Sequence, residues 1–411
     1  MTAAALDPGA LAPLDARVSA GGRIGVAISG GSDSTALLIL LLDRYGPEAL
    51  ASATVDHRLR PASAAEAASV GALCVRLGIS HDTLAWQRAP EDTGNLQDAA
   101  RRARYGLLSG WAATRGLADI ALGHTRDDNA ETFLLGLSRG AGLDGLTGMR
   151  PSFARGAVTF HRPLLSARRE ALRQMLRARG LTWADDPSNE DPRFDRVRAR
   201  RALALLAPLG IDADGLAQTI DHLADTRTAI DATLSDWARA HTRTDRGDLL
   251  IDRAALAAQP RDFARRLLSA ALRWIAGADY PPRAAPVLAL LTADAATTLH
   301  GCLVTPGPDT LRLSREPRAA ARATPAAPGD TWDTRWRLAA ARGTVRALTE
   351  AGLAHCPDWR ATGLPRASLA ASPALWDGDT LIAAPLARFG TEIPVELAKG
   401  RDDFPAALLS R

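Results

Sequence analysis

Short apolar runs alternate with longer amphipathic segments over residues 23–135. The short runs predict strands at 23–29, 50–55, 79–86 and 118–122. The longer segments place apolar residues at helical spacing and predict helices at 34–44, 64–77, 95–114 and 127–137. Strands that alternate with helices predict an α/β fold, with a parallel sheet covered by helices on both faces. Ligands bind such sheets beyond the carboxyl ends of the strands.

The pattern changes after residue 162. An amphipathic helix is predicted at 167–179, an acid-rich loop follows at 184–195, and residues 206–300 show apolar positions at helical spacing. Residues 315–330 are rich in Pro, Ala and Arg, which is typical of a linker, and 331–411 hold short apolar runs broken by Pro and Gly. We therefore predict an α/β domain at 1–205, a helical domain at 206–314, a linker at 315–330 and a small C-terminal α+β domain at 331–411.

Composition is that of a protein with packed cores, since 46% of the 411 residues are apolar and 23% are charged. The formal charge is only +4, but residues 162–201 hold eleven arginines against six acidic residues, a local net charge of +5. Arginine bonds phosphate oxygens two at a time, so this cluster favours a polyanionic partner. A coding bias toward arginine is the competing explanation for its excess over lysine, of which Lys399 is the sole example.

Three cysteines, Cys74, Cys302 and Cys356, are too scattered for a disulfide framework, a zinc site or a redox pair. The first 22 residues contain acids and prolines and lack the apolar core of a signal peptide. The longest apolar run, residues 36–42, is far too short to cross a membrane. We expect a cytoplasmic protein without a membrane partner.

The sequence SGGSDS at residues 29–34 lies between the first predicted strand and its helix. Gly30 and Gly31 allow a sharp turn whose N–H groups approach an anion, and the following helix directs its positive end to the same place. Ser29, Ser32 and Ser34 add hydroxyl donors. Asp33 would repel a polyphosphate unless a cation lies between them, so we predict a Mg²⁺–nucleotide site with Asp33 as the metal ligand. An ordinary Gly/Ser turn is the alternative.

SGGSDS resembles the phosphate loop of the ATP-pyrophosphatase (PP-loop) family, whose adenine nucleotide α-hydrolase-like members cleave ATP between the α and β phosphates. Further segments resemble the bacterial tRNA(Ile)-lysidine synthases, in order along residues 22–205. These segments are VDHRLR (55–60), Asn95 with Arg101, Arg104 and Tyr105, GHTRDDNAET (123–132), SRGAGLDGLTGM (138–149), RPLL (162–165), and DDPSNED (185–191) with Arg196 and Arg200. One departure is Val197, where the family more often has asparagine.

The resemblance implies an ATP- and Mg²⁺-dependent ligase whose partners are free L-lysine and a tRNA(Ile) with a CAU anticodon. It implies that residues 29–34 and Asp56 bind ATP, and that the catalytic residues are Asp33, His124, Asp128 and Glu131. The implied tRNA contacts are Arg101, Arg104, Arg196 and Arg200, with further tRNA contacts in the domains at 206–314 and 331–411. A homodimer is left open.

Ordinary structural roles compete with several of these assignments. Acids in the first turn of a helix are good capping residues, which is the alternative for Asp127. Capping or packing competes with ligand contact for His57. A surface ion pair with Asp98 competes with phosphate binding for Arg101 and Arg104, and a solvated helix face competes for the arginines at 193–201.

Two other functions share parts of this pattern. A tRNA thiolase would use the same adenylation step, but such enzymes typically need a cysteine nucleophile or paired cysteines near the site, and none of the three cysteines is so placed in the sequence. A basic RNA-binding scaffold without chemistry would need no carboxylates facing RNA phosphates. Release of pyrophosphate with and without tRNA distinguishes these classes.

Overall fold

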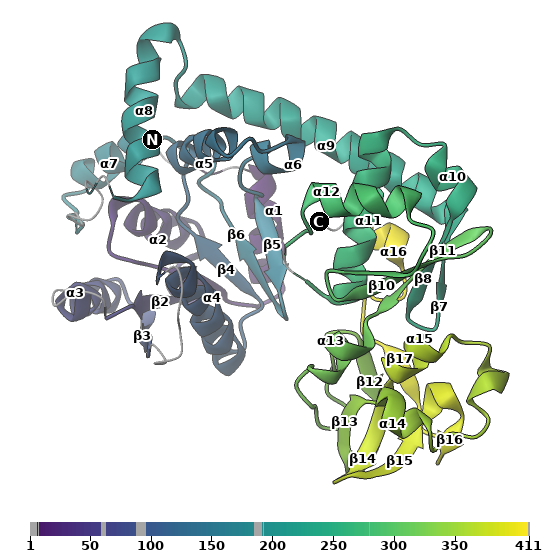
Figure 1. Ribbon diagram of the computed structural model, residues 1–411. Helices are drawn as coiled ribbons and strands as arrows, with labels where there is room; N and C mark the ends of the chain where they lie inside the picture. Colours follow the sequence, from purple (N-terminus) through teal and green to yellow (C-terminus); the bar gives the residue numbers. More distant parts are fainter. Residues whose placement is uncertain are drawn as a thin grey trace. The chain divides into compact units, whose positions relative to one another are not determined.

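The computed structural model describes residue 6 and residues 8–58, 63–87, 96–184, 191, 193–278 and 280–409 (Figure 1). The chain divides into two compact units, Met1–Arg227 and Thr228–Arg411. Among the described residues, no single helix is long and apolar enough to span a bilayer, and only the bent pair Asp195–Leu209 and Ala213–His241 passes that test together, by length and composition.

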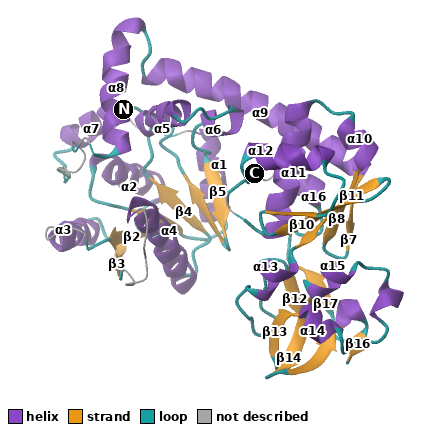
Figure 2. Cartoon of the chain, viewed as in Figure 1, coloured by secondary structure: helices purple, strands orange, loops and turns teal. Residues whose placement is uncertain are grey.

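A six-stranded sheet forms the centre of the first unit, in the order β3-β2-β1-β4-β6-β5 (Figures 1 and 2). Its strands are β1 (Ile24–Ala27), β2 (Leu50–Asp56), β3 (Ser80–Ala85), β4 (Asp119–Leu122), β5 (Ser152–Arg155) and β6 (Val158–His161). All neighbours pair in parallel except β5, which pairs antiparallel with β6. The predicted parallel sheet is confirmed, and the β5–β6 hairpin extends it beyond the four strands that the pattern predicted.

The helices of this unit are α1 (Pro8–Ser19), α2 (Ser32–Tyr45), α3 (Ser63–Arg76), α4 (Leu96–Arg115), α5 (Arg126–Ser138), α6 (Leu143–Leu146), α7 (Arg169–Ala178) and α8 (Asp195–Leu206). One core cluster packs α1, α2, α3 and α7 against the sheet, and a second packs α4 against it. Helix α2 is buried continuously from Thr35 to Leu41, as its nearly all-round apolar sequence predicts. Helices cover both faces of the sheet, so a ligand approaches it at the ends of the strands. The SGGSDS loop follows β1 at the carboxyl end.

The long helix α9 (Ala213–His241) follows α8 and the short 3₁₀ segment η3 (Ala207–Leu209). Its first turns pack on α5 through Ala213, Leu216 and Ile220, together with Phe133. The end of the first unit at Arg227 therefore falls inside α9 rather than at the predicted boundary near residue 205.

The second unit begins with an antiparallel sheet in the order β7-β8-β11-β10-β9. Its strands are β7 (Thr242–Asp245), β8 (Asp248–Asp252), β9 (Thr297–Leu299), β10 (Cys302–Pro306) and β11 (Thr310–Arg315), with helices α10 (Arg253–Ala257), α11 (Arg261–Ala276), α12 (Ala284–Ala289) and the 3₁₀ segment η4 (Leu290–Thr292). Residues 206–314 thus hold helices, as predicted for the helical domain, and also these strands, which that prediction did not include.

Two tight hairpins explain that error. Arg246 and Gly247 join β7 to β8 with φ of 49° and 92°, and His300 and Gly301 join β9 to β10 with φ of 56° and 72°. Positive φ at both residues of a two-residue turn matches the twist of paired strands. Strands this short, placed between helices, show little alternation of apolar and polar residues. The turn residues were therefore a clearer indication of paired strands than the strands themselves.

A second group of strands completes this unit, with β13-β14-β15-β16 in one sheet and β12 paired with β17. The strands are β12 (Trp336–Leu338), β13 (Thr344–Ala347), β14 (Pro373–Asp377), β15 (Thr380–Ala384), β16 (Phe389–Gly390) and β17 (Val395–Leu397). The helices are α13 (Pro317–Ala321), α14 (Thr349–Leu353), α15 (Arg366–Ala370) and α16 (Phe404–Leu409), with 3₁₀ segments η5 (Trp359–Thr362) and η6 (Pro385–Ala387). The strands and helices of residues 331–411 agree with the α+β structure predicted for them.

The predicted linker at 315–330 is wrong as a structural description, because it is packed and partly regular. Arg315 ends β11 and bonds Asp333 at 2.8 Å, α13 follows, and Ala326 forms a β-bridge with Val345. Its Pro-, Ala- and Arg-rich composition resembles a linker, but these contacts bind it to the C-terminal sheet.

Candidate active site

The loop between β1 and α2 has the geometry of an anion cradle. Gly30 has φ of 86°, a conformation that glycine adopts without strain. Gly31 caps α2 in an extended conformation with φ of −71° and ψ of 164°, so the next N–H groups form the first turn of the helix. The first N–H groups of a helix lack carbonyl partners within it and attract anions. The loop thus presents backbone donors beyond the carboxyl end of β1.

Serine hydroxyls and a distant glycine hold the shape of this loop. The Ser34 hydroxyl accepts the N–H of Ser29 at 3.1 Å, lies 3.1 Å from the Ser29 hydroxyl, and donates to the Gly31 carbonyl at 3.2 Å. Gly123, which follows β4, packs on the same turn, since a Cβ there would lie 2.8 Å from Ser34 Cα. Backbone atoms cannot move aside as a side chain can. The close approach of β4 to the loop therefore requires glycine at 123.

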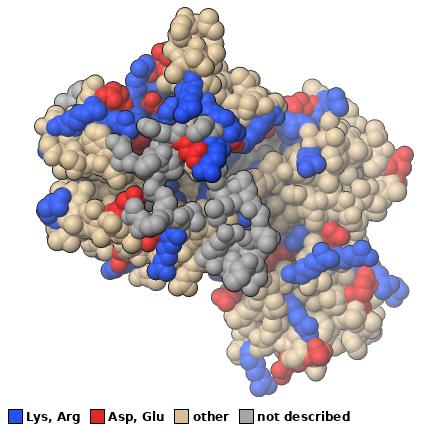
Figure 3. Space-filling view, turned by 60° about the vertical axis from the view of Figure 1, so that its left-hand side comes forward, with Lys and Arg blue, Asp and Glu red and all other residues tan. Residues whose placement is uncertain are grey.

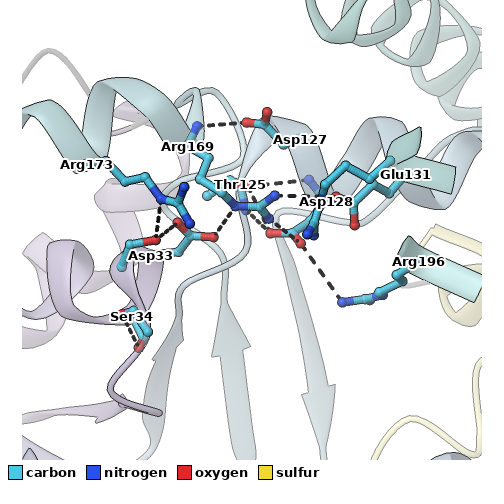
Figure 4. A network of polar contacts seen from close by, with 12 residues as sticks. Asp33, Ser34, Thr125, Asp127, Asp128, Glu131, Arg169, Arg173 and Arg196 are labelled. Atoms are coloured by element: carbon cyan, nitrogen blue, oxygen red, sulfur yellow. Dashed lines mark hydrogen bonds and ion pairs between the residues drawn. The ribbon is translucent and has the colours of Figure 1, made fainter. Parts of the chain in front are cut away.

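Asp33 is held by an arginine from α7, 136 residues away in sequence. Arg169 donates through Nε to Asp33 Oδ2 at 2.8 Å, and the Ser32 hydroxyl donates to Asp33 Oδ1 at 2.9 Å (Figure 4). Arg173, one turn further along α7, donates to the Ser32 hydroxyl at 3.3 Å. The phosphate loop is therefore flanked by two arginines, whose positive charge compensates the carboxylate of Asp33 and favours an anionic ligand.

The same arginine joins the carboxylates of α5 to this site. Arg169 Nη2 donates to Asp128 Oδ1 at 2.9 Å, and Nη1 to Glu131 Oε1 at 3.4 Å (Figure 4). Its backbone N–H donates to Asp127 Oδ2 at 2.7 Å. The structure thus brings together Asp33, Asp128 and Glu131, three of the predicted catalytic residues, around one guanidinium group.

Sequence reasoning did not single out Arg169. One local signal was present: an arginine at the first position of a helix opposes the positive end of the helix dipole. Such a residue calls for compensating carboxylates elsewhere, but the sequence does not say which ones. The 38 to 136 residues that separate Arg169 from its partners made the pairing invisible before folding.

Asp128 also takes part in the N-terminal capping of α5. The Thr125 N–H and hydroxyl donate to Asp128 Oδ2 at 2.8 and 2.9 Å, which completes a capping box with Thr125 as the N-cap. The capping role considered for Asp127 therefore falls on Asp128. Burial alone would raise the pKa of Asp128, but the charge of Arg169 and these hydrogen bonds hold it below its ordinary value.

Glu131 is more deeply buried than Asp128, with 1% of its side chain exposed against 11%. Arg200 of α8 donates to its Oε1 at 2.9 Å, whereas Oε2 is buried and has no hydrogen-bond partner in the part of the chain that the structure describes. Burial and the neighbouring Asp128 carboxylate raise the pKa of Glu131. The two carboxyl groups therefore differ: Asp128 is firmly ionised, whereas Glu131 takes up a proton more readily.

His124 precedes α5 and is bonded by an arginine from the end of β6. Arg162 donates through Nε to His124 Nδ1 at 3.1 Å. Burial, with Arg162 and Arg104 also contributing, lowers the pKa of His124 to about 3. His124 is therefore neutral near pH 7.

Arginines from two helices surround this histidine. Arg196 of α8 lies 4.0 Å from Asp128, and Arg104 of α4 is deep enough that burial and the charges of Arg101 and Arg196 lower its pKa. No carboxylate among the described residues pairs with Arg104. Arg101 is exposed and lies over the Tyr105 ring at 5.5 Å. Asp98 was the alternative ion-pair partner of Arg101 and Arg104, and its side chain is not among those that the structure describes. Asn95 and residues 185–190 also lie outside the described residues.

The other predicted nucleotide contact, Asp56, ends β2. Its carboxylate accepts the N–H of Arg58 at 2.9 Å, and this hydrogen bond lowers its pKa. His57 packs edge-on against Trp86, with ring centroids 5.8 Å apart. Asp56 stabilises its own turn, and contact with ATP stays a prediction for both residues.

Residues 11–206 match the family model for the PP-loop domain. The fold and the loop thus define a PP-loop protein, a class that uses ATP.

Curated relatives identify the family more narrowly. The chain is 47% identical to the tRNA(Ile)-lysidine synthase of Ruegeria pomeroyi, over 94% of both chains. It is 41% identical to that of Hyphomonas neptunium, over 69% of this chain and 78% of the relative, and 36% identical to that of Bradyrhizobium sp., over 72% and 90%. This chain belongs to the tRNA(Ile)-lysidine synthase family.

Proposed function

We propose that this chain joins lysine to C2 of the wobble cytidine of a CAU-anticodon tRNA(Ile), as a carbon–nitrogen ligase. The cytosine O2 attacks the α-phosphorus of ATP, an O-adenylate forms and pyrophosphate leaves. The ε-amine of lysine then attacks C2, and the C2–O bond breaks to release AMP. O2 is a poor leaving group until it is adenylated, which is why the two steps occur in this order.

A single observation carries this proposal: Arg169 bonds the phosphate loop and the α5 carboxylates at once, through 2.8 Å to Asp33 and 2.9 Å to Asp128. Adenylation and amine transfer act on adjacent atoms of one base, O2 and C2. An enzyme that performs both must therefore hold ATP and the amine within one side chain's reach of each other, and the loop and carboxylates meet that requirement.

The ATP phosphates are assigned to the loop at residues 29–34, whose helix-start N–H groups have no acceptor within the helix, and the ribose or base to Asp56. Among the described residues no group of three or more His, Cys, Asp or Glu side chains forms a metal site. One carboxylate, Asp33, fits Mg²⁺ nevertheless, because Mg²⁺ commonly takes one or two carboxylates and completes its ligands with phosphate oxygens and water. Bound there, Mg²⁺ would offset charge on the phosphates.

Asp128 and Glu131 are assigned to lysine. Free lysine carries an ammonium group near pH 7, with an unperturbed pKa of about 10.4, and must lose a proton before it attacks. The ionised Asp128 binds the ammonium, and the raised pKa of Glu131 makes it the better acceptor of that proton. The ion pairs of both carboxylates with Arg169 support this assignment, since a positively charged group already lies against them.

The tRNA is assigned to the arginines. Basic side chains form a band across the upper left of the face in Figure 3, and Arg101, Arg104, Arg196 and Arg200 are the residues proposed to contact RNA phosphates. Arg200 is tied to Glu131 in the structure, so its RNA contact would compete with that pair. We extend the tRNA interface to the regions at 206–314 and 331–411, and we expect the reaction to occur in the cytoplasm.

The test is incubation with ATP, Mg²⁺, labelled lysine and a CAU-anticodon transcript, followed by mass analysis of the nucleosides. Lysine should appear on one cytidine, with one pyrophosphate and one AMP released. A GAU-anticodon transcript, which lacks the target cytidine, is the substrate control. Asp128→Asn with Glu131→Gln should release pyrophosphate but fail to transfer lysine. Unmodified cytidine at saturating substrates would reject the proposal.

Sulfur transfer is not favoured by any observation. The cysteines Cys74, Cys302 and Cys356 are all buried, and burial raises the pKa of each thiol. A thiolate nucleophile needs the opposite environment.

A further inference from the structure

We propose that Arg162 is a positioning residue that fixes His124 as a neutral imidazole with its proton on Nε2, and that this N–H donates to a phosphate oxygen of the bound nucleotide. The second half rests on the proposed function, whereas the first concerns the protein alone. His124 would then act as a hydrogen-bond donor rather than as a general base.

The hydrogen bond from Arg162 determines which ring nitrogen of His124 carries the proton. A guanidinium group has five N–H donors and no acceptor. The 3.1 Å contact from Arg162 Nε therefore requires a lone pair on His124 Nδ1. An imidazole whose Nδ1 accepts carries its one proton on Nε2. Protonation of Nδ1 would place two N–H groups against each other.

Neighbouring groups hold the Arg162 side chain in this orientation. It is 6% exposed, its Nη1 donates to the Arg150 carbonyl at 2.5 Å, and its guanidinium lies 4.5 Å from the centre of the Phe153 ring. Arg150 and Phe153 come from the β5 side of the β5–β6 hairpin, so three contacts fix the guanidinium plane. Because the Arg162 guanidinium is fixed and can only donate, His124 is left with the Nε2–H tautomer.

The surroundings of His124 also disfavour its cationic form. Burial lowers its pKa to about 3, and Arg162, Arg104 and Arg196 act in the same direction, against the opposing charge of Asp128. A group with so low a pKa is a weak base near pH 7. Arg104 and Arg196 at the same time favour an anion beside the imidazole.

The position of His124 selects the phosphate as its acceptor. It directly follows Gly123, the residue whose Cβ would lie 2.8 Å from Ser34 Cα in the phosphate loop. Among the described residues, the His124 ring has one hydrogen bond, that from Arg162 to Nδ1, and the largely buried side chain keeps some exposure to solvent. An N–H without an acceptor, beside an anion cradle and among arginines, fits a phosphoryl oxygen.

Nitrogen NMR of ¹⁵N-histidine-labelled protein tests the tautomer without substrate. The His124 signal, assigned by its loss in His124→Gln, should show the Nε2–H tautomer without titration between pH 5 and 8. Arg162→Lys, which can only donate, should preserve it, whereas Arg162→Gln, whose amide can also accept, should admit the Nδ1–H form. An imidazolium or an Nδ1–H tautomer in the wild-type protein would overturn the inference.

Pyrophosphate release tests the donor role. The glutamine amide offers an oxygen to Arg162 and an N–H near the Nε2 position, but it cannot act as a base at neutral pH. His124→Gln should therefore stay within about 10-fold of wild type in kcat, whereas His124→Ala should lose about 100-fold, the effect of removing one oxyanion donor. Equal loss in both variants would overturn the donor role. Failure of the wild type to release pyrophosphate would instead reject the proposed function, and the NMR result would stand.

Discussion

Removal of the Arg169 charge should destabilise the first unit far more than removal of a surface arginine. Arg169→Met keeps much of the side-chain length but deletes the guanidinium. It leaves Asp33, Asp128 and Glu131 facing one another, with exposed fractions of 17%, 11% and 1%. Three carboxylates that share one site repel when their common cation is lost.

The magnitude follows from burial. Removal of one partner of a fully buried ion pair costs about 3–5 kcal/mol, since a charge is left without compensation. Arg169 is 15% exposed, and Arg200 still bonds Glu131 at 2.9 Å, so part of that cost is relieved. We expect the free energy of unfolding to fall by about 2–4 kcal/mol.

Urea unfolding measures the free energy of unfolding of the chain. Hydrogen exchange in peptides from β1 and β4 measures the stability of the first unit separately. Arg177→Met is the matched control, because Arg177 lies on the same helix and pairs with Glu170 at 2.9 Å while both side chains are more than half exposed. The control should lose less than about 1 kcal/mol. Glu131→Gln added to Arg169→Met should recover part of the loss, since it neutralises a stranded charge.

Equal losses in Arg169→Met and Arg177→Met would refute the reasoning, as would a double variant less stable than Arg169→Met alone. Either result would mean that the carboxylates do not depend on Arg169 for their compensation.

Three further predictions follow from single features of the first unit. Gly123→Ala should raise the KM for ATP at least about 10-fold, because its Cβ would lie 2.8 Å from Ser34 Cα, whereas Gly110→Ala on α4, with open space around it, should leave the KM unchanged; ATP titrations of pyrophosphate release check both. Arg196→Gln should reduce the slope of log affinity for tRNA against log salt by about 0.7–0.9 if Arg196 neutralises one phosphate, and an unchanged slope in filter-binding assays would contradict that contact. The folded-state pKa of His124 is lowered to about 3, so below pH 6.5 the unfolded chain binds a proton at this residue and the folded chain does not. The free energy of unfolding should therefore fall as pH drops from about 6.5 toward 3. His124→Gln should lessen that slope by up to about 1.4 kcal/mol per pH unit in urea unfolding, and identical slopes would exclude His124 as its source.

The sequence by itself determined the parts of this protein that are encoded locally. The order of strands and helices over residues 23–135 followed from apolar spacing, because each element buries one face or stripe of its own residues. The phosphate loop was equally visible, since its strand, glycines and helix start are contiguous. Asp128 and Glu131 were singled out by the resemblance of residues 123–132 to the corresponding segment of the tRNA(Ile)-lysidine synthases.

Only the tertiary structure decided how these parts are paired in space. Arg169 meets Asp33 across 136 residues and Asp128 across 41, and Arg162 meets His124 across 38. Ion pairs and donor–acceptor choices of this kind depend on which strand ends lie side by side, and no local periodicity records that. The β7–β8 and β9–β10 hairpins were missed for a related reason. Strands of three to five residues carry too little pattern, and β8 and β10 both pair with β11, which the local sequence does not record. The chemistry of each side chain is therefore local, whereas its protonation and its partner are set by the fold.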